Sequence, residues 1–211
     1  MIIAIDGPAA AGKGTLARAI ADKFSFAYLD TGSLYRAVAH AVLITGAQPS
    51  NEAVAVEAAQ GLDVDKIDPI AIRTPEVAAA ASIVAAMVPV RAAILQFQRQ
   101  FAQTPPNGAK GAVLDGRDIG TVVCPEADAK LFVSARAEIR AHRRWLELKV
   151  SGSELTEAQV LADVSERDRR DQERKHSPLK PAQDAYLLDT SDLSIETAFE
   201  QALAFIEGSK G

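Results

Sequence analysis

The residues that most clearly indicate chemistry lie near the start of the chain, in the segment GPAAAGKGT. The segment follows the apolar run IIAI and precedes TLARAIADKF, whose apolar residues recur at helical spacing. In such a loop the backbone N–H groups point inward at phosphates, the helix N-terminus adds partial positive charge, and the lysine reaches the β and γ phosphates. The segment therefore predicts a nucleoside triphosphate site. Its residues are Gly7, Pro8, Ala9, Ala10, Ala11, Gly12, Lys13, Gly14 and Thr15.

The same loop bears on magnesium. Its hydroxyl comes at Thr15, whereas in the GK[ST] form the hydroxyl directly follows the lysine. Asp115 ends the apolar run GAVLD, the position at which P-loop proteins keep a carboxylate that organises Mg²⁺ and its waters. We expect Mg²⁺ to be held through the phosphates and water, and direct or water-mediated ligation by Thr15 and Asp115 stays open.

Two other interpretations of the loop are weaker. The letters GKGTLA also fit the GxGxxA pattern of dinucleotide-binding folds, with Asp30 as the ribose-binding acid. The stretch from Ile5 to Gly12 is longer than the tight turn of that fold, however. A turn without any ligand is the other interpretation, but a lysine between two glycines is a poor choice for a turn alone.

Two further polar segments come at the ends of apolar runs. In DTGSLYR, Thr31 offers a hydroxyl and Arg36 lies one helical turn further along, although a capped helix with a surface arginine would look the same. In DGRDIGT, Arg117 offers a phosphate donor and Asp118 an acceptor for a base or sugar. A turn with a local salt bridge between Arg117 and Asp118 is the alternative.

The last of the candidate functional segments is the basic segment ERDRRDQERKHSPLK. On a helix, Arg167, Asp171 and Arg174 are spaced to lie on one face. A solvated helix with surface ion pairs has the same pattern. Phosphoryl transfer, however, needs cations around the transferring oxygens, and mobile arginine-rich segments supply them while excluding water.

The elements that must position these residues alternate along the chain. Five apolar runs are typical of buried strands: 2–5, 26–30, 111–115, 129–134 and 185–189. Because they alternate with helical patterns, they predict an α/β fold with a mostly parallel sheet and ligands at the carboxyl ends of its strands. Three of the five runs end in aspartate.

The remaining segments are predicted to be helical. We expect a single domain with its core at 1–45, 109–135 and 181–211, a helical insert at about 46–108, and a lid region at about 136–180. In the insert, Thr74 can cap a helix that has Pro75 at its first position, and Pro89 starts another. In the lid, Thr156 and Gln159 are spaced as a capping box.

Composition and charge limit the class of protein. The chain has 211 residues, 48% apolar and 24% charged, which fits one globular domain and excludes a disordered or collagen-like chain. No run reaches the roughly 18 apolar residues of a membrane span, no secretory signal is readable, and the lone Cys124 cannot form an intramolecular disulfide. We therefore expect a cytoplasmic protein. The net charge of −5 argues against nucleic acid as a partner.

Taken together, these segments closely resemble the bacterial cytidylate kinases. The resemblance is carried, in order, by GPAAAGKGTLA, LDTGSLYRAVA, IRTPEVAAAAS, LDGRDIGTVV, AHRRWLEL, ERDRRDQER and YLLDTSDLSIE, and it covers almost the whole chain. It implies a P-loop three-layer fold with a five-stranded parallel sheet, a helical acceptor-nucleotide insert and an Arg-rich lid. Departures are Ala9 and Ala10, where the family often has Ser and Gly, and a shorter segment at 62–77.

The resemblance also implies roles for residues. Positions that match substrate-binding residues are Thr31, Arg36, Ser82, Arg91, Arg117, Asp118, Arg167, Asp171 and Arg174. Arg36 and Arg117 would hold the acceptor phosphate. Ser82, Arg91 and Asp118 would read the cytosine edge. In the basic segment, Arg167, Asp171 and Arg174 would surround the ribose and form part of the lid. Positions that match catalytic residues are Lys13, Asp115, Arg117, Arg167 and Arg174.

The expected function is therefore ATP-dependent phosphorylation of CMP and dCMP by direct in-line transfer, with Mg²⁺ as cofactor. We expect a monomer whose partners are ATP and CMP or dCMP, and neither nucleic acid nor a membrane. The alternatives are another small-molecule P-loop kinase, of the AMP or shikimate type, and a nucleotide-binding switch protein. The base-reading trio argues against the first, and no water-positioning residue or switch loop supports the second.

Overall fold

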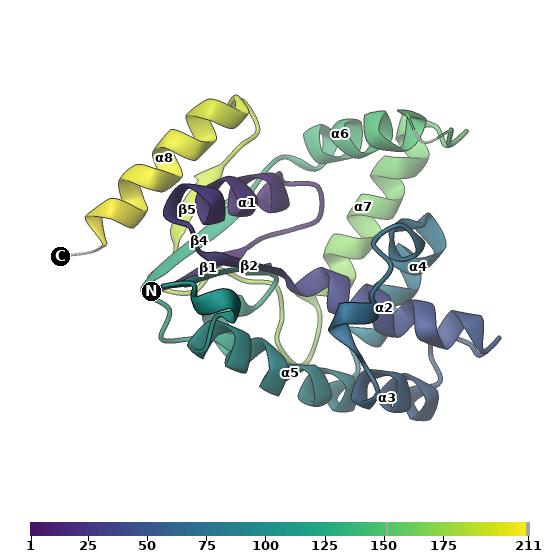
Figure 1. Ribbon diagram of the computed structural model, residues 1–211. Coiled ribbons are helices and arrows are strands. Elements are labelled where there is room, and N and C mark those ends of the chain that lie inside the picture. The colour runs from purple at the N-terminus through teal and green to yellow at the C-terminus, as the bar shows by residue number, and fades with distance from the viewer. Residues whose placement is uncertain (151, 210–211) are drawn as a thin grey trace. The chain divides into compact units, whose positions relative to one another are not determined.

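The computed structural model describes residues 1–150 and 152–209, which form two compact units (Figure 1). The sheet unit comprises Met1–Leu29 and Pro105–Gly211, and the helical unit comprises Asp30–Thr104. Strands and helices alternate along the sheet unit, whereas the helical unit consists of helices and short 3₁₀ turns.

The sheet has five strands in the order β2-β3-β1-β4-β5. Its strands are β1 (Ile2–Asp6), β2 (Ala27–Asp30), β3 (Ala112–Gly116), β4 (Ala129–Ser134) and β5 (Tyr186–Asp189). Strand β1 pairs in parallel with β3 and β4, and β4 pairs in parallel with β5. The five strands lie where the apolar runs predict them, so the expected parallel α/β fold is confirmed. Ile3, Ala4 and Ile5 are fully buried because β1 is central, which explains its continuous apolar sequence.

Two helices pack on this sheet with their apolar sides. They are α1 (Lys13–Phe24) and α8 (Ile195–Gly208). Leu16 and Ile20 of α1 and Ile206 of α8 share one buried cluster with Ile5 and Leu131 of the strands. The cluster fixes the first turn of α1 against the end of β1.

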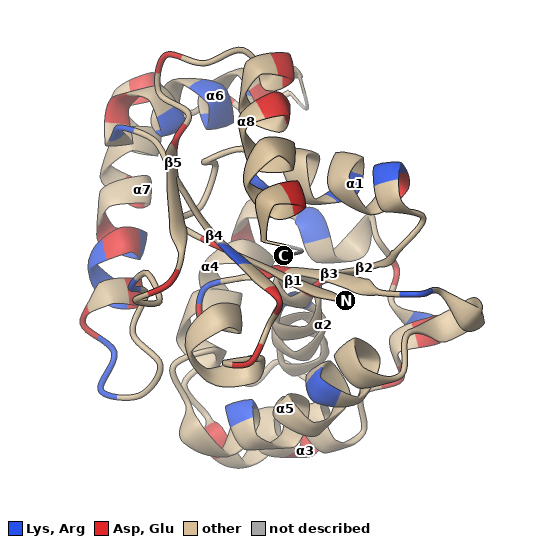
Figure 2. Ribbon diagram, turned by 90° about the vertical axis from the view of Figure 1, so that its left-hand side faces the viewer, with Lys and Arg blue, Asp and Glu red and all other residues tan. Residues whose placement is uncertain are grey.

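The expected lid region forms two helices of the sheet unit. They are α6 (Ala137–Val150) and α7 (Glu157–Gln172), which pack through Ala141, Leu148, Val160 and Val164. The Thr156 side chain accepts a hydrogen bond from the backbone N–H of Gln159, and the Gln159 side chain accepts one from the backbone N–H of Thr156. The capping box is therefore confirmed. Figure 2 shows Lys and Arg along both helices.

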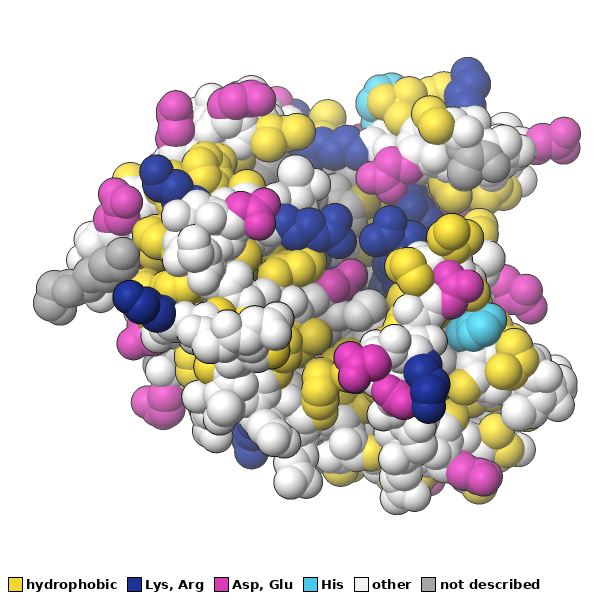
Figure 3. Space-filling model, viewed as in Figure 1, with side chains coloured by type: hydrophobic (Ala, Val, Ile, Leu, Met, Phe, Trp, Pro, Cys, Tyr) yellow, Lys and Arg dark blue, Asp and Glu magenta, His cyan; other side chains and the backbone are white. Residues whose placement is uncertain are grey.

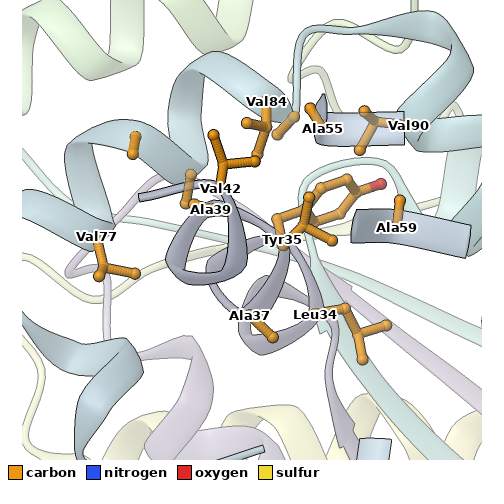
Figure 4. Packing of buried hydrophobic residues seen from close by; sticks show 14 of the residues in the cluster. Leu34, Tyr35, Ala37, Ala39, Val42, Ala55, Ala59, Val77, Val84 and Val90 are labelled. Atoms are coloured by element: carbon orange, nitrogen blue, oxygen red, sulfur yellow. The ribbon is translucent and has the colours of Figure 1, made fainter. Parts of the chain in front are cut away.

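The helical unit has four helices around its own core (Figure 4). These are α2 (Thr31–Ile44), α3 (Glu52–Gln60), α4 (Pro75–Val84) and α5 (Val88–Gln103), with 3₁₀ turns η1 (Val64–Lys66) and η2 (Ala71–Arg73). Thr74 accepts a hydrogen bond from the backbone of Val77, so its predicted cap is confirmed.

The helical unit begins earlier than the expected insert. It starts at Asp30 and so includes α2, which the sequence assigned to the core. The physical reason is packing: Leu34, Val38 and Val42 of α2 are buried in one cluster with Val77 and Val84 of α4. Among the described residues no single helix is long and apolar enough to span a membrane. Pro75–Val84 and Val88–Gly108 together have the length and composition, but they are bent by 99° at the break between them.

Candidate phosphoryl-transfer site

The phosphate loop runs from the end of β1 to the start of α1. Gly7 has φ 147°, and a Cβ there would lie 1.9 Å from the carbonyl oxygen of Val133, so only glycine fits. Gly12 caps α1 in the left-handed region, with φ 85°. Lys13 is the first residue of α1 and 6% exposed. The sequence-predicted loop therefore stands at a helix N-terminus, the geometry that favours an anion.

Three carbonyl oxygens of the loop accept hydrogen bonds from side chains. Lys13 Nζ donates to the carbonyl of Pro8 at 3.0 Å, and Thr190 Oγ1 donates to that of Ala11 at 3.1 Å. An Nη1 of Arg140 lies 3.3 Å from the carbonyl of Ala9. These contacts hold the loop by its carbonyl groups. The sequence analysis did not single out Thr190, which lies within YLLDTSDLSIE, or Arg140, which directly precedes AHRRWLEL.

Asp115 lies beside the first turn of α1. Its side chain is buried and accepts a hydrogen bond from the hydroxyl of Tyr28 at 3.0 Å. A Cβ on Gly14 would lie 3.4 Å from Asp115 Oδ2, which places the carboxylate next to the lysine end of the loop. Thr15 is exposed on α1. Tyr28 was missed because a tyrosine within a strand has no distinctive sequence pattern.

Asp6, at the carboxyl end of β1, is a second buried acid. Its carboxylate accepts hydrogen bonds from the backbone N–H of Ile119 at 2.7 Å and of Gly120 at 2.8 Å. These residues open the π-helical turn η4 (Ile119–Val123), directly after Arg117 and Asp118. The pKa of Asp6 is raised to about 7, because the raising effects of burial and of nearby Asp118 outweigh the lowering effects of the two N–H groups and Lys13. Asp6 therefore fixes the segment that bears two predicted site residues.

Arg117 pairs with a residue of α7. Its Nε lies 3.0 Å from Oδ2 of Asp171, and Arg174 also donates to Asp171. Asp118 is 4% exposed. Burial acts to raise the pKa of Asp171, but Arg117, Arg174 and Arg167 together hold it below its ordinary value.

Two expectations about the basic segment change with the structure. Helix α7 ends at Gln172, so Arg174 lies beyond it and does not share its face by helical spacing. The chain turns there because Leu179 donates its backbone N–H to the carbonyl of Asp171 at 2.8 Å. Asp171 is 1% exposed, so this side of the segment is not solvated, whereas Arg169 makes the exposed pairs with Glu166 and Glu173.

The other predicted substrate residues belong to the helical unit. Thr31 is buried at the start of α2, and Arg36 is half-buried one turn further along. Ser82 on α4 is 3% exposed, and its Oγ has no hydrogen-bond partner among the described residues. On α5, Nη1 of Arg91 donates to the carbonyl of Ala85 at 3.2 Å. The Cζ atom of Arg91 lies 5.5 Å from the ring centroid of Tyr35.

The predicted site residues thus fall into two sets. The sheet unit contains the phosphate loop, Asp115, Arg117, Asp118 and the basic segment. The helical unit contains Thr31, Arg36, Ser82 and Arg91. Figure 3 shows Lys and Arg side chains gathered beside α6 and α7. In the described parts, 1–150 and 152–209, no three His, Cys, Asp or Glu side chains are grouped as metal ligands.

The parallel sheet, the glycine-bounded loop at the start of α1 and the buried carboxylate at the end of β3 define a P-loop protein of the α/β kinase class. Among solved structures, TT1252 from Thermus thermophilus has a similar fold, with a TM-score of 0.52 and 19% identity over 100% of this chain and 98% of that one. An uncharacterised protein from Eubacterium ventriosum has a TM-score of 0.55 and 13% sequence identity, with 98% of both chains covered.

Sequence comparison shows the family. The profile of the family described as cytidylate kinase matches residues 3–208. A cytidylate kinase of Paramagnetospirillum magneticum is 57% identical over 209 residues, covering 99% of this chain and 98% of the relative. The cytidylate kinase of Rhodopseudomonas palustris is 55% identical over 207 residues, covering 98% of this chain and 96% of the relative. The chain belongs to the cytidylate kinase family.

Proposed function

We propose that the protein transfers the γ-phosphoryl group of ATP to CMP and dCMP, giving ADP with CDP or dCDP. The observation that carries the proposal is the family match over residues 3–208, which includes the phosphate loop and the segment of Arg117 and Asp118. No observation favours the AMP, shikimate or switch-protein alternatives.

The loop Gly7–Thr15 would bind the phosphates of ATP. Its support is the position of Lys13 at the N-terminus of α1 and the hydrogen bonds to the carbonyls of Pro8, Ala9 and Ala11. Because side chains hold these carbonyls, the loop is restrained before ligand enters, and a restrained dipolar site needs less reorganisation during transfer.

The residues proposed for the acceptor nucleotide are those that match substrate-binding positions of the family. Arg36 and Arg117 would bind the phosphate of CMP, and Thr31 would add a hydroxyl. Ser82, Arg91 and Asp118 would read cytosine, whose exocyclic amine donates to a carboxylate while O2 and N3 accept. Support comes from the Ser82 hydroxyl, which is buried without a partner among the described residues, since a ligand would satisfy it. Arg167, Asp171 and Arg174 would lie around the ribose.

The transfer itself needs no covalent intermediate. An oxygen of the acceptor phosphate attacks the γ-phosphorus, and the bond from that phosphorus to the oxygen bridging to the β-phosphate breaks, so that ADP leaves with the electron pair. Lys13, Arg117, Arg167 and Arg174 would neutralise the charge on the transferring group. Closure of the α6 and α7 region would exclude water and align both nucleotides.

Magnesium would enter with ATP. A buried carboxylate at Asp115, next to Gly14 and the exposed Thr15, is an oxygen donor set of the type that Mg²⁺ takes. Asp115 and Thr15 would hold the ion, directly or through water, and the ion would supply charge neutralisation. We further propose that the protein works as a cytoplasmic monomer.

The test is a coupled assay of ADP formation with CMP, dCMP, UMP, AMP, GMP and shikimate as acceptors. The expected result is that CMP and dCMP have the highest kcat/KM. A preference for AMP or shikimate, or ADP formation that does not respond to any acceptor, would contradict the proposal. The exposed-pair variant Glu166→Gln serves as the matched control for intact protein.

A further inference from the structure

Arg140 connects three segments of the sheet unit through one guanidinium group. It lies in α6, and its side chain is 6% exposed. Its Nε donates to the carbonyl of Ala135 at 2.7 Å, and its Nη1 donates to that of Ala9 at 3.3 Å. The same group makes a two-pronged contact with Asp168, at 3.1 and 2.5 Å. The end of β4, the phosphate loop and α7 therefore share one side chain.

Asp168 belongs to the buried side of α7. Its side chain is 14% exposed, whereas Glu166 on the same helix is 48% exposed and pairs with the exposed Arg169. Asp168 directly follows Arg167 and precedes Asp171 by less than one helical turn. Because a helix moves as a rigid element, the position of Asp168 sets the positions of both neighbours.

The chemistry of the contact favours coupling. A guanidinium is planar, and its N–H groups keep fixed angles, so the contacts to Ala9 and to Asp168 cannot adjust independently. A shift of the Ala9 carbonyl as phosphates enter the loop must therefore change the Arg140 to Asp168 contact or move α7 with it. In the proposed function neither Arg140 nor Asp168 touches a reacting atom.

We propose that Arg140 and Asp168 are positioning residues, which couple occupancy of the phosphate loop to the placement of Arg167 and Asp171 on α7. Binding of ATP alone then orders α7 for the acceptor. This inference rests on the proposed function, because it takes the loop to be the ATP site.

The test compares hydrogen exchange in residues 157–172 with and without a non-hydrolysable ATP analogue, in the absence of CMP. The variant is Asp168→Asn, and the matched control is Glu166→Gln, a carboxylate-to-amide change on the exposed side of α7. We expect the analogue to slow exchange by at least ~5-fold in the wild type and the control, and by less than ~2-fold in Asp168→Asn, on the scale of local opening. A role in stability alone would lower protection with and without analogue equally.

A second variant covers the case in which Asp168→Asn does not fold. The double substitution Arg140→Met with Asp168→Leu replaces the buried pair by apolar groups of similar volume, which proteins often tolerate. We expect it to fold, to bind the analogue, and to lack the slowing in α7.

The outcomes separate the coupling from the function. Equal slowing in the wild type and in either folded variant would overturn the coupling, as would a wild type that binds the analogue without any slowing. A wild type that does not bind the analogue would overturn the proposed function, and the coupling with it. Kinetics give a further check: Asp168→Asn should lower kcat at least ~10-fold, with the KM for ATP changed less, because the cost falls on alignment.

Discussion

The Nε atom of Arg117 lies 3.0 Å from the Oδ2 atom of Asp171, and the two residues are 54 positions apart in the chain. The pair joins the segment after β3 to α7, and the side chain of Asp171 is 2% exposed. Arg174 donates to the other carboxylate oxygen. One buried carboxylate therefore holds two arginines that the proposed function places around the acceptor nucleotide.

Replacing Asp171 by Asn should destabilise the protein by about 3–5 kcal/mol, because it removes the buried carboxylate that pairs with both Arg117 and Arg174. Urea unfolding at pH 7 measures this cost. The control Glu173→Gln breaks an exposed pair with Arg169 and should cost less than about 1 kcal/mol.

The destabilisation caused by Asp171→Asn should become smaller as the pH falls. The pKa of Asp171 is lower in the folded protein than its ordinary value of 3.8, so its charge stabilises the fold at and above that pH. This stabilisation is lost as the pH falls through the folded pKa, where a protonated Asp171 resembles Asn. The difference between wild type and Asp171→Asn should therefore shrink below pH 3.8. A difference that stays constant would mean that Asp171 is not ionised in the fold.

Asp6 should give the opposite pH dependence. Burial raises its pKa from 3.8 to about 7, so the folded state binds more protons than the unfolded state between these values. Its contribution to stability is then fully present below pH 3.8 and is lost as the pH rises to about 7. The free energy of unfolding of the wild type minus that of Asp6→Asn should fall by up to about 1.4 kcal/mol per pH unit in this window. A flat difference would show that Asp6 does not titrate there.

Replacing Lys13 by Ala should lower kcat by at least ~100-fold, since it removes a charge aimed at the transferring phosphoryl group. The circular dichroism spectrum should stay unchanged, because the loop keeps the contacts from Arg140 and Thr190. Activity within a few-fold of the wild type in folded protein would contradict the assignment of the phosphate loop.

Base choice should depend on Asp118. If its carboxylate accepts from the cytosine amine, Asp118→Ala should cost about 1–3 kcal/mol in kcat/KM for CMP. UMP should lose less, because its O4 is an acceptor that the wild-type carboxylate repels. Measuring both nucleotides on both proteins tests the ratio of CMP to UMP, which should fall. An unchanged ratio would remove Asp118 from base reading.

Local patterns allowed the strands, the phosphate loop and the helix caps to be predicted. The glycines at 7 and 12 and the caps at Thr74 and Thr156 act within a few residues, so their sequence context contains the whole cause. Apolar runs identify strands for the same reason.

The contacts of charged residues could not be predicted in this way. Asp6, Arg117 and Arg140 each bind groups far away in the chain, and two of these residues use backbone atoms that carry no sequence signal. Helical spacing alone did not distinguish the buried Asp171 from the exposed Glu166. The apolar pattern of α2 likewise marks a buried side without identifying α4 as the helix that covers it.

The central claim is that a phosphoryl group passes from ATP directly to CMP. A single-turnover reaction with ATP labelled at its γ-phosphorus, CMP and Mg²⁺, followed by separation of the products, measures this most directly. The expected result is label in the β-phosphate of CDP, with little free phosphate. Label released as inorganic phosphate at the same rate with or without CMP would instead show hydrolysis and would contradict a cytidylate kinase activity.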